Sequence, residues 1–249
     1  MKKEQAKKKE RLDRLLIEKG LAASREKARA LIMAGRVWVE GDRIDKAGKE
    51  VDKYSEVTLK GALPYVSRGG IKLAGALKHF SFKVCDKVAM DVGASTGGFT
   101  DCLLKEGAKK VYAVDVGYGQ LDWSLRRDRR VILIERKNVR YLTLNNLGEM
   151  VDLSVIDVSF ISLEKVIPPV VECVKRSGNI LALLKPQFEV GKGEVGKGGI
   201  VRDTEKHKKV IDKIAEFSIG LGLKIKGVEE SPIKGAKGNR EFWIYLGVL

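Results

Sequence analysis

The sequence predicts an α/β protein with a mostly parallel, Rossmann-like central sheet, preceded by a small α+β unit. Three observations lead to this fold class. From residue 87 onward, apolar strand-like runs alternate with helical patterns, which is typical of a parallel sheet covered on both faces. Two strand-like runs near the C-terminus are close enough to pair antiparallel. The composition changes at Pro64, which indicates a domain boundary.

The composition is that of a globular protein with a strong basic surplus. The chain has 249 residues, 44% of them hydrophobic, enough for one or two domains with sizeable cores. Its 48 Lys and Arg against 33 Asp and Glu give a net charge of +15, which favours a polyanionic partner such as nucleic acid. No apolar run approaches the roughly 18 residues that span a bilayer, and none follows the basic residues 2–9, so we expect a cytoplasmic protein without a membrane partner.

Neither disulfide nor metal chemistry is expected. Cys85, Cys102 and Cys173 match neither a disulfide framework nor a zinc motif, and all three lie in apolar segments, which predicts reduced and buried thiols. The two histidines, His79 and His207, are expected on helix surfaces. The sequence therefore predicts no metal site.

Residues 11–60 are expected to form a small domain, after a basic extension over residues 1–10. Ser24 is the expected N-cap of a second helix and Gly35 its expected end. Two helical stripes of apolar residues define the helices: Leu12, Leu15 and Leu16, then Ala28, Leu31 and Ile32. Short strands are predicted around a turn at residues 40–42 and again at residues 57–59.

Basic side chains crowd one end of these two helices. Residues 1–60 hold 17 basic and 11 acidic residues, an excess of six. A solvated helix face is the alternative interpretation, since most charge runs are of that kind. The candidate RNA-binding residues are Arg11, Arg14, Ser24, Arg25, Lys27, Arg29, Arg36 and, beyond the linker, Arg68.

Residues 61–66 are the expected linker and residues 67–249 the expected α/β domain. Pro168 and Pro169 should kink or divide the helix predicted at 161–175. Other helices are predicted at 98–106, at 121–126 and, with one apolar face, through Val210, Ile211, Ile214, Phe217, Ser218 and Leu221. Strands are predicted at 87–92, 110–115, 131–134, 152–157, 179–184, 223–230 and 241–248.

The run from Val88 to Phe99 reads as a buried strand, a glycine turn and the start of a helix. Its Gly-x-x-x-Gly-Gly spacing differs from the Gly-x-Gly-x-x-Gly of dinucleotide folds, so no pyrophosphate cradle is predicted. Asp115, at the tip of the next strand, can accept hydrogen bonds from both hydroxyls of a ribose. S-adenosylmethionine, which has no phosphate, fits this pattern better than NAD. A turn that merely needs small residues is the alternative.

Four charged residues that are distant in sequence form a predicted constellation, and three of them lie at strand ends on one edge of the sheet. Asp157 and Lys185 end two parallel strands, Glu241 begins the antiparallel last strand, and Lys72 follows the linker. In an open α/β sheet the carboxyl ends of the strands face the ligand crevice. These side chains should therefore meet beside the cofactor.

Three strings in the small domain resemble the S4 RNA-binding domain: Arg11-Leu12-Asp13-Arg14-Leu15-Leu16, Ala23-Ser24-Arg25-x-x-Ala28-x-x-Leu31-Ile32 and Gly35-x-Val37-x-Val39-x-Gly41. Several strings of the α/β domain resemble the FtsJ-like ribose methyltransferases, and the two parts together resemble the TlyA family, often labelled hemolysins. The strings are Ser-Arg-Gly-Gly-x-Lys-Leu at 67–73, Asp-Val-Gly-Ala-Ser-Thr-Gly-Gly-Phe-Thr-Asp at 91–101, Ala-Val-Asp-Val-Gly-Tyr-Gly-Gln-Leu at 113–121, Asp-Val-Ser-Phe-Ile-Ser at 157–162 and Leu-Lys-Pro-Gln-Phe-Glu at 184–189. The resemblance implies a class I methyltransferase fold, S-adenosylmethionine as cofactor, and 2′-O-methylation of cytidine in ribosomal RNA, either free or in a ribosomal subunit.

The resemblance also implies residue roles. Lys72, Asp157, Lys185 and Glu241 would be the catalytic tetrad. Two roles for Lys185 stay open: it removes the proton of the ribose hydroxyl, or it stays charged and stabilises the developing alkoxide. The cofactor contacts carried over are Asp91, Gly93, Ala94, Ser95, Thr96, Gly97, Gly98, Phe99, Asp115, Val116, Asn138, Val139 and Asp157.

Other readings are less well supported by the residues. The segment Gly191–Gly198 has P-loop spacing, but Gly198 stands where a P-loop has Ser or Thr, so we expect a basic loop over an RNA site. Asp157-Val158-Ser159-Phe160 lacks both prolines of the base-amino methyltransferase motif. A non-catalytic RNA-binding or ribosome-assembly factor on the same fold is the alternative function, and a pore-forming cytolysin has little physical support.

Overall fold

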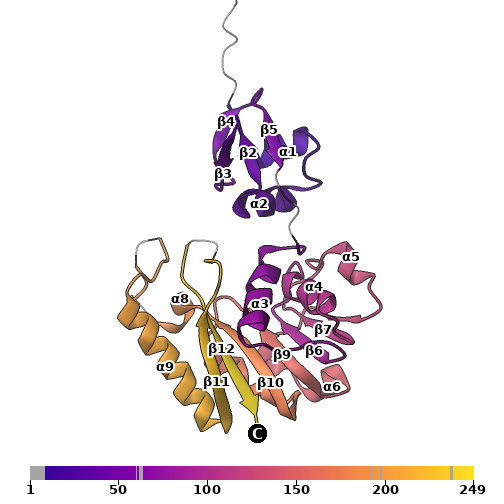
Figure 1. The fold of residues 1–249 in the computed structure, drawn as a ribbon, viewed down its shortest axis with the longest axis vertical. Helices are drawn as coiled ribbons and strands as arrows, with labels where there is room; N and C mark the ends of the chain where they lie inside the picture. The colour runs from indigo at the N-terminus through magenta and orange to yellow at the C-terminus, as the bar shows by residue number, and fades with distance from the viewer. Residues whose placement is uncertain (1–8, 60, 62–63, 192, 197, 236–237) are drawn as a thin grey trace, which may run out of the picture. The chain divides into compact units, whose positions relative to one another are not determined.

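The computed structural model describes residues 9–59, 61, 64–191, 193–196, 198–235 and 238–249 (Figure 1). The chain divides into two compact units, Met1–Pro64 and Tyr65–Leu249. Residues 1–8 of the expected N-terminal extension and residues 62 and 63 of the expected linker lie outside the described residues. Lys192 and Lys197 of the glycine-rich loop do so too.

The smaller unit packs two helices against short strands. Ser24 caps the second helix by accepting a hydrogen bond from the amide of Lys27 at 3.2 Å, and Gly35 follows the helix end with φ of 67°. Both predicted helix boundaries are therefore confirmed. The core holds Leu12, Leu16, Ala28, Ile32, Val37, Val39 and Ile44. The elements are β1 (Lys9–Arg11), α1 (Leu12–Glu18), α2 (Arg25–Met33), β2 (Val37–Val39), β3 (Asp42–Ile44), β4 (Glu50–Asp52) and β5 (Val57–Leu59).

Among the described residues, β2 pairs antiparallel with both β3 and β5, and β1 pairs antiparallel with β4. The pair β1–β4 was not predicted, because Lys9–Arg11 and Glu50–Asp52 are mostly charged and show no apolar alternation. This pairing fixes the backbone just before α1.

Within the described residues, the larger unit is built on a seven-stranded sheet of order β11-β12-β10-β9-β6-β7-β8. The strands β10, β9, β6, β7 and β8 are parallel, and β12 is antiparallel to both of its neighbours. This topology confirms the predicted fold class. The strands are β6 (Val88–Val92), β7 (Lys110–Val114), β8 (Val131–Ile134), β9 (Val151–Ile156), β10 (Val174–Leu184), β11 (Leu223–Glu230) and β12 (Phe242–Val248).

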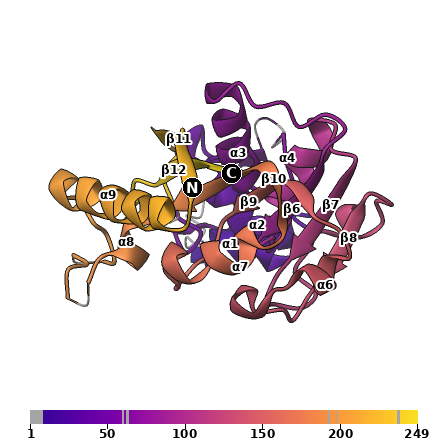
Figure 2. The same ribbon diagram turned by 90° about the horizontal axis from the view of Figure 1, so that it is seen from below.

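Helices cover both faces of this sheet, and each face has its own apolar core (Figure 2). One face is covered by α3 (Arg68–His79), α4 (Gly98–Lys105) and α5 (Trp123–Arg126). The other is covered by α6 (Leu144–Leu147), α7 (Ile167–Val171) and α9 (Thr204–Gly220). Short segments complete the unit: the 3-10 turns Val139–Tyr141 and Leu163–Lys165, and α8 (Pro186–Glu189).

Some predictions for the larger unit were wrong in detail. The helix predicted at 161–175 is divided, as predicted, into a 3-10 turn and α7, with the two prolines in the first turn of α7. Its predicted end was wrong, because α7 ends at Val171 and β10 already begins at Val174. Proline lacks the N–H that a helix interior needs, so the prolines start a new helix here. Leu221 lies beyond the end of α9 and is exposed. The predicted antiparallel pairing of the last two strands is confirmed, whereas the position of β12, between β11 and β10, was not predicted.

Two single-residue predictions were also wrong. Cys85 is exposed, whereas Cys102 and Cys173 are buried as predicted. His207 is buried and has partners for its ring: Nε2 lies 2.9 Å from the carbonyl of Val201, and the ring packs on Phe242. In the described part of the chain, no helix has the length and apolar character needed to cross a bilayer.

Candidate active site

The four charged residues of the predicted constellation are brought together. Asp157 directly follows β9, and Lys185 directly follows the neighbouring strand β10. Phe242, the first residue of β12, pairs with Leu184, the last residue of β10, so Glu241 lies at the same edge as Lys185. The antiparallel direction of β12 is what places its start at the carboxyl ends of the parallel strands.

These residues form two ion pairs. Lys72 Nζ lies 2.6 Å from Glu241 Oε2, and Lys185 Nζ lies 2.5 Å from Asp157 Oδ1. Lys185 Nζ also lies 3.2 Å from the hydroxyl oxygen of Ser159. Three of the four side chains are nearly buried, with exposed fractions of 11% for Lys72, 4% for Glu241 and 10% for Lys185, against 21% for Asp157. Buried charges of this kind are retained in proteins when they are paired.

Helix α3 carries Lys72 to this edge. Its N-cap is Ser67, whose hydroxyl accepts a hydrogen bond from the amide of Gly69 at 3.3 Å. A Cβ on Gly70 would lie 2.2 Å from the ring of Tyr65, and a Cβ on Gly98 would lie 2.9 Å from the amide nitrogen of Gly70. The glycines therefore allow the first turns of α3 and α4 to approach each other closely.

A cavity of about 820 Å³ opens at the same edge of the sheet. It extends from the Gly93 turn across the ends of β7 and β8 to Asp157, which forms the ion pair with Lys185. The predicted cofactor residues among its lining are Gly93, Ser95, Asp115, Val116, Asn138, Val139 and Asp157. Its size suits a drug-sized or nucleoside-sized ligand.

Asp115 holds the glycine turn in shape. Its Oδ2 accepts a hydrogen bond from the amide of Ser95 at 2.7 Å, and its Oδ1 accepts one from the amide of Gly117 at 2.6 Å. A carboxylate has lone pairs for about four hydrogen bonds, so two further donors can be accommodated. The position at the end of the second strand and the remaining acceptor capacity fit a ribose diol.

The remaining predicted cofactor residues do not line the cavity. Asp91, Ala94, Gly97, Gly98 and Phe99 are buried behind it, and Thr96 is exposed beside it. Phe99 packs against Trp243 at 5.5 Å between ring centroids, and a Cβ on Gly97 would lie 2.3 Å from the side chain of Leu125. In this structure these residues shape the turn from within.

Asp91 is a fully buried carboxylate in β6. Its Oδ2 accepts hydrogen bonds from the amide of Thr100 at 2.9 Å and from the hydroxyl of Thr100 at 2.7 Å. Burial raises the pKa of Asp91 to about 7, although the bonds from Thr100 oppose that shift. Asp91 thereby ties the strand to the start of α4.

Several residues that line the cavity were not predicted as site residues from the sequence. Phe160 is 90% exposed, with φ of 63°, and its ring lies 4.9 Å from that of Phe188. A positive φ is uncommon for an aromatic residue and is often found at functional sites. The strings at 157–162 and 184–189 contain these residues, but nothing in their spacing gave them a function. The others are Val92, Val114, Gln120, Lys137, Arg140, Val158, Ser159, Ile161, Ser162 and Lys165.

The predicted RNA-binding residues are distributed over both units. In the smaller unit, Arg11, Arg25 and Arg29 converge on one carboxylate, that of Asp13. Ser24 serves as the cap of α2, and Arg14 is exposed on α1. The remaining three are Lys27 on α2, Arg36 just before β2, and Arg68 in the larger unit, whose Nη2 donates to the carbonyl of Lys234 at 2.7 Å.

Comparisons with known proteins give a family match for both parts of the chain. The family model for the FtsJ-like methyltransferases matches residues 65–248, and the model for the S4 domain matches residues 10–57. The chain is 51% identical to YqxC of Bacillus subtilis over 96% of its own length and 86% of the relative's. It is 46% identical to the 16S/23S rRNA (cytidine-2′-O)-methyltransferase TlyA of Mycobacterium tuberculosis, over 95% of this chain and 89% of that one. A solved Streptococcus thermophilus structure that carries a hemolysin name is 45% identical, with a TM-score of 0.77, covering 98% of this chain and 90% of that one.

Fold, sheet edge and family models together define an FtsJ-like methyltransferase domain that follows an S4 domain. The identity to the relatives extends over both units. The chain belongs to the TlyA family.

Proposed function

We propose that this chain transfers a methyl group from S-adenosylmethionine to the ribose 2′-hydroxyl of a cytidine in ribosomal RNA. The observation that carries the proposal is the pair of lysine–carboxylate contacts, Lys72–Glu241 and Lys185–Asp157, at the edge of the sheet where Asp157 also lines the cavity. The name of the Mycobacterium tuberculosis relative supports the choice of substrate and of cytidine.

The residues around the cavity fit S-adenosylmethionine. Asp115 offers carboxylate oxygens at the position where a ribose diol would bind, and Gly93 has φ of 87° with no room for a side chain, because a Cβ would lie 2.4 Å from the carbonyl oxygen of Asp157. Asn138 and Val139 line the part of the cavity where an adenine would lie. When bound, the cofactor supplies an electrophilic methyl group on a sulfonium.

A ribose hydroxyl is a poor nucleophile, so the protein must hold it in line and deal with its proton. Lys185 is the candidate for that task, because its ammonium lies beside Asp157 at the cavity edge. Asp157 orients Lys185, and Glu241 holds Lys72 at the same edge. As a neutral amine, Lys185 accepts the hydroxyl proton; as a charged ammonium, it stabilises the developing alkoxide while the proton passes to solvent water. The exposed ring of Phe160 offers a stacking surface for a base at the mouth of the cavity.

The direct test is the variant Lys185→Ala. With purified Bacillus subtilis ribosomal subunits and tritiated S-adenosylmethionine, we expect methyl transfer to fall by about 100-fold or more, as is usual when a group that handles the proton is removed. Binding of S-adenosylmethionine, measured by calorimetry, and of rRNA should change little.

A matched control is available on the same two strands. Lys175, in β10, forms an ion pair with Asp152, in β9, at 2.7 Å, but at the opposite end of these strands. Lys175→Ala should therefore leave turnover near the wild-type value. Unchanged turnover in Lys185→Ala, or absence of S-adenosylmethionine binding to the wild-type protein, would overturn the proposal and favour a non-catalytic RNA-binding factor.

A further inference from the structure

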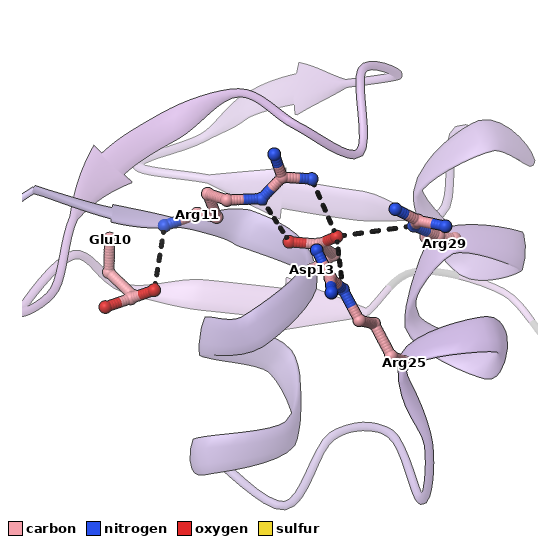
Figure 3. A network of polar contacts seen from close by, with 5 residues as sticks. All are labelled: Glu10, Arg11, Asp13, Arg25 and Arg29. Carbon is pink, nitrogen blue, oxygen red and sulfur yellow. Dashed lines mark hydrogen bonds and ion pairs between the residues drawn. The ribbon is translucent and has the colours of Figure 1, made fainter.

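The smaller unit contains a fully buried carboxylate that contacts three arginines (Figure 3). Arg11 donates from Nε to Asp13 Oδ1 and from Nη2 to Asp13 Oδ2, both at 3.0 Å. Arg25 Nε lies 3.1 Å and Arg29 Nε lies 3.4 Å from the same Oδ2. Arg11 comes from β1, whereas Arg25 and Arg29 are four residues apart on α2, so Asp13 joins two separate elements.

The carboxylate of this cluster is buried, and the three arginine side chains that contact it are partly exposed. The side chain of Asp13 has no exposed surface, whereas those of Arg11, Arg25 and Arg29 are 38%, 41% and 50% exposed. One negative charge thus lies beneath three positive charges, which gives these four side chains together a net charge of +2. Three guanidinium groups so close together would repel one another without the carboxylate.

The contacts leave the outer nitrogens of the arginines available. Arg25 and Arg29 both reach Asp13 through Nε, and among the described residues their Nη groups make no further hydrogen bond. A guanidinium held by one edge still presents its other N–H donors in a rigid fork, which matches the oxygens of a phosphate. Fixing the fork in advance lowers the entropy that binding would otherwise cost.

We propose that Asp13 is a positioning residue that organises Arg11, Arg25 and Arg29 into a preformed surface for phosphate groups of folded RNA. The inference rests on the proposed function, since it concerns how the same chain holds its rRNA substrate. The hydrogen bond from Arg11, followed by that from Arg25, holds the pKa of Asp13 well below its usual range, so the carboxylate keeps its charge at every pH at which the protein works.

The direction in which the variant Asp13→Asn changes RNA affinity tests the inference. It removes a negative charge beneath a basic surface, so electrostatics alone would tighten RNA binding. If Asp13 positions the arginines, affinity of the full-length protein for purified Bacillus subtilis ribosomal subunits should instead weaken by about tenfold, and the slope of log K against log salt should become shallower by about one to two.

Glu26→Gln is the matched control, because it removes the same charge from the first turn of α2, between Arg25 and Arg29, without touching Asp13. It should leave affinity unchanged or slightly raise it. Unchanged or tighter binding by Asp13→Asn with a normal melting temperature would overturn the inference while leaving the methyltransferase proposal intact. Binding to phosphatidylglycerol vesicles that exceeds binding to subunits, and that Asp13→Asn abolishes, would overturn the assignment to RNA.

A second measurement does not depend on the folding of any variant. In the wild-type protein, nitrogen-15 relaxation of the arginine Nε–H groups should show restrained motion at Arg11, Arg25 and Arg29. Arg14 is the internal reference, because it is exposed on α1 and forms no ion pair with another described residue. Nε–H groups of the three arginines as mobile as that of Arg14 would contradict a preformed surface.

Discussion

At the scale of single residues, the molecule combines buried charges with partners from distant parts of the chain. Lys72 and Glu241 are 169 residues apart in sequence, yet they form a contact that is almost fully shielded from solvent. The sequence placed Glu241 at the sheet edge, because a predicted strand begins there, and the family resemblance grouped Lys72 with it. The sequence could not predict which lysine pairs with which carboxylate, since that depends on the lateral position of α3 against the sheet.

Asp91 gives a pH-dependent prediction at this scale. Its folded-state pKa of about 7 lies above the usual value near 3.8, so the folded protein binds more protons than the unfolded chain between these values. The contribution of Asp91 to the stability of the fold therefore decreases as pH rises from about 4 to 7. We expect Asp91→Asn, which keeps an acceptor for Thr100, to gain stability relative to wild type as pH rises from about 4 to 7, as measured by urea unfolding at several pH values. A stability difference that does not vary with pH would contradict this assignment.

At the scale of elements, the close approach of α3 and α4 builds the site. The strands and the glycine turn could be predicted from the alternation of apolar runs and from the spacing of Gly93, Gly97 and Gly98. Helix α3 was not predicted, because its start, Arg68-Gly69-Gly70, has a low helix propensity. Tertiary contacts override that propensity, since only glycine leaves room for Tyr65 and for the start of α4.

Substituting Gly98 tests this packing. An alanine Cβ there would lie 2.1 Å from the hydroxyl of Ser67 and 2.9 Å from the amide nitrogen of Gly70, and the backbone atom cannot simply rotate away. We expect Gly98→Ala to lower the free energy of unfolding by about 1–3 kcal/mol. At Gly220, in the last turn of α9, an added Cβ would have nothing within 4 Å, so Gly220→Ala should be neutral or raise stability by up to about 1 kcal/mol. Equal effects in urea unfolding would refute the packing argument.

At the scale of the whole molecule, the net charge of +15 indicated a polyanionic partner, and the family models add an S4 domain to a methyltransferase domain. The sequence located the basic residues of α1 and α2. Nothing in the sequence indicated that basic side chains converge on Asp13, because Asp13 has the pattern of an ordinary acidic residue in the first turn of a helix. The pairing of β1 with β4 fixes the backbone of Arg11, which lies two residues before that carboxylate.

An experiment can separate the effect of where the basic residues lie from the effect of the total net charge on RNA binding. We expect reversing Arg14, Arg25 and Arg29 to glutamate to weaken binding to ribosomal subunits and to reduce the salt slope by about three. Reversing the exposed residues Lys83, Lys109 and Lys224 makes the same change in net charge away from the candidate site. Lys83 lies in the connection before β6, Lys109 directly before β7, and Lys224 at the start of β11. Equal losses in the two triple variants, measured by filter binding across a salt series, would show that only total charge matters.

The central claim is that the two ion pairs at the sheet edge act on a ribose hydroxyl of rRNA. Its most direct test is a map of 2′-O-methylation across all rRNA from cells that carry the wild-type gene, the Lys185→Ala variant or a deletion. We expect at least one cytidine to be methylated with the wild-type gene and unmethylated in both other strains. Identical maps in the three strains, or a lost methyl group that lies on a base, would contradict the claim.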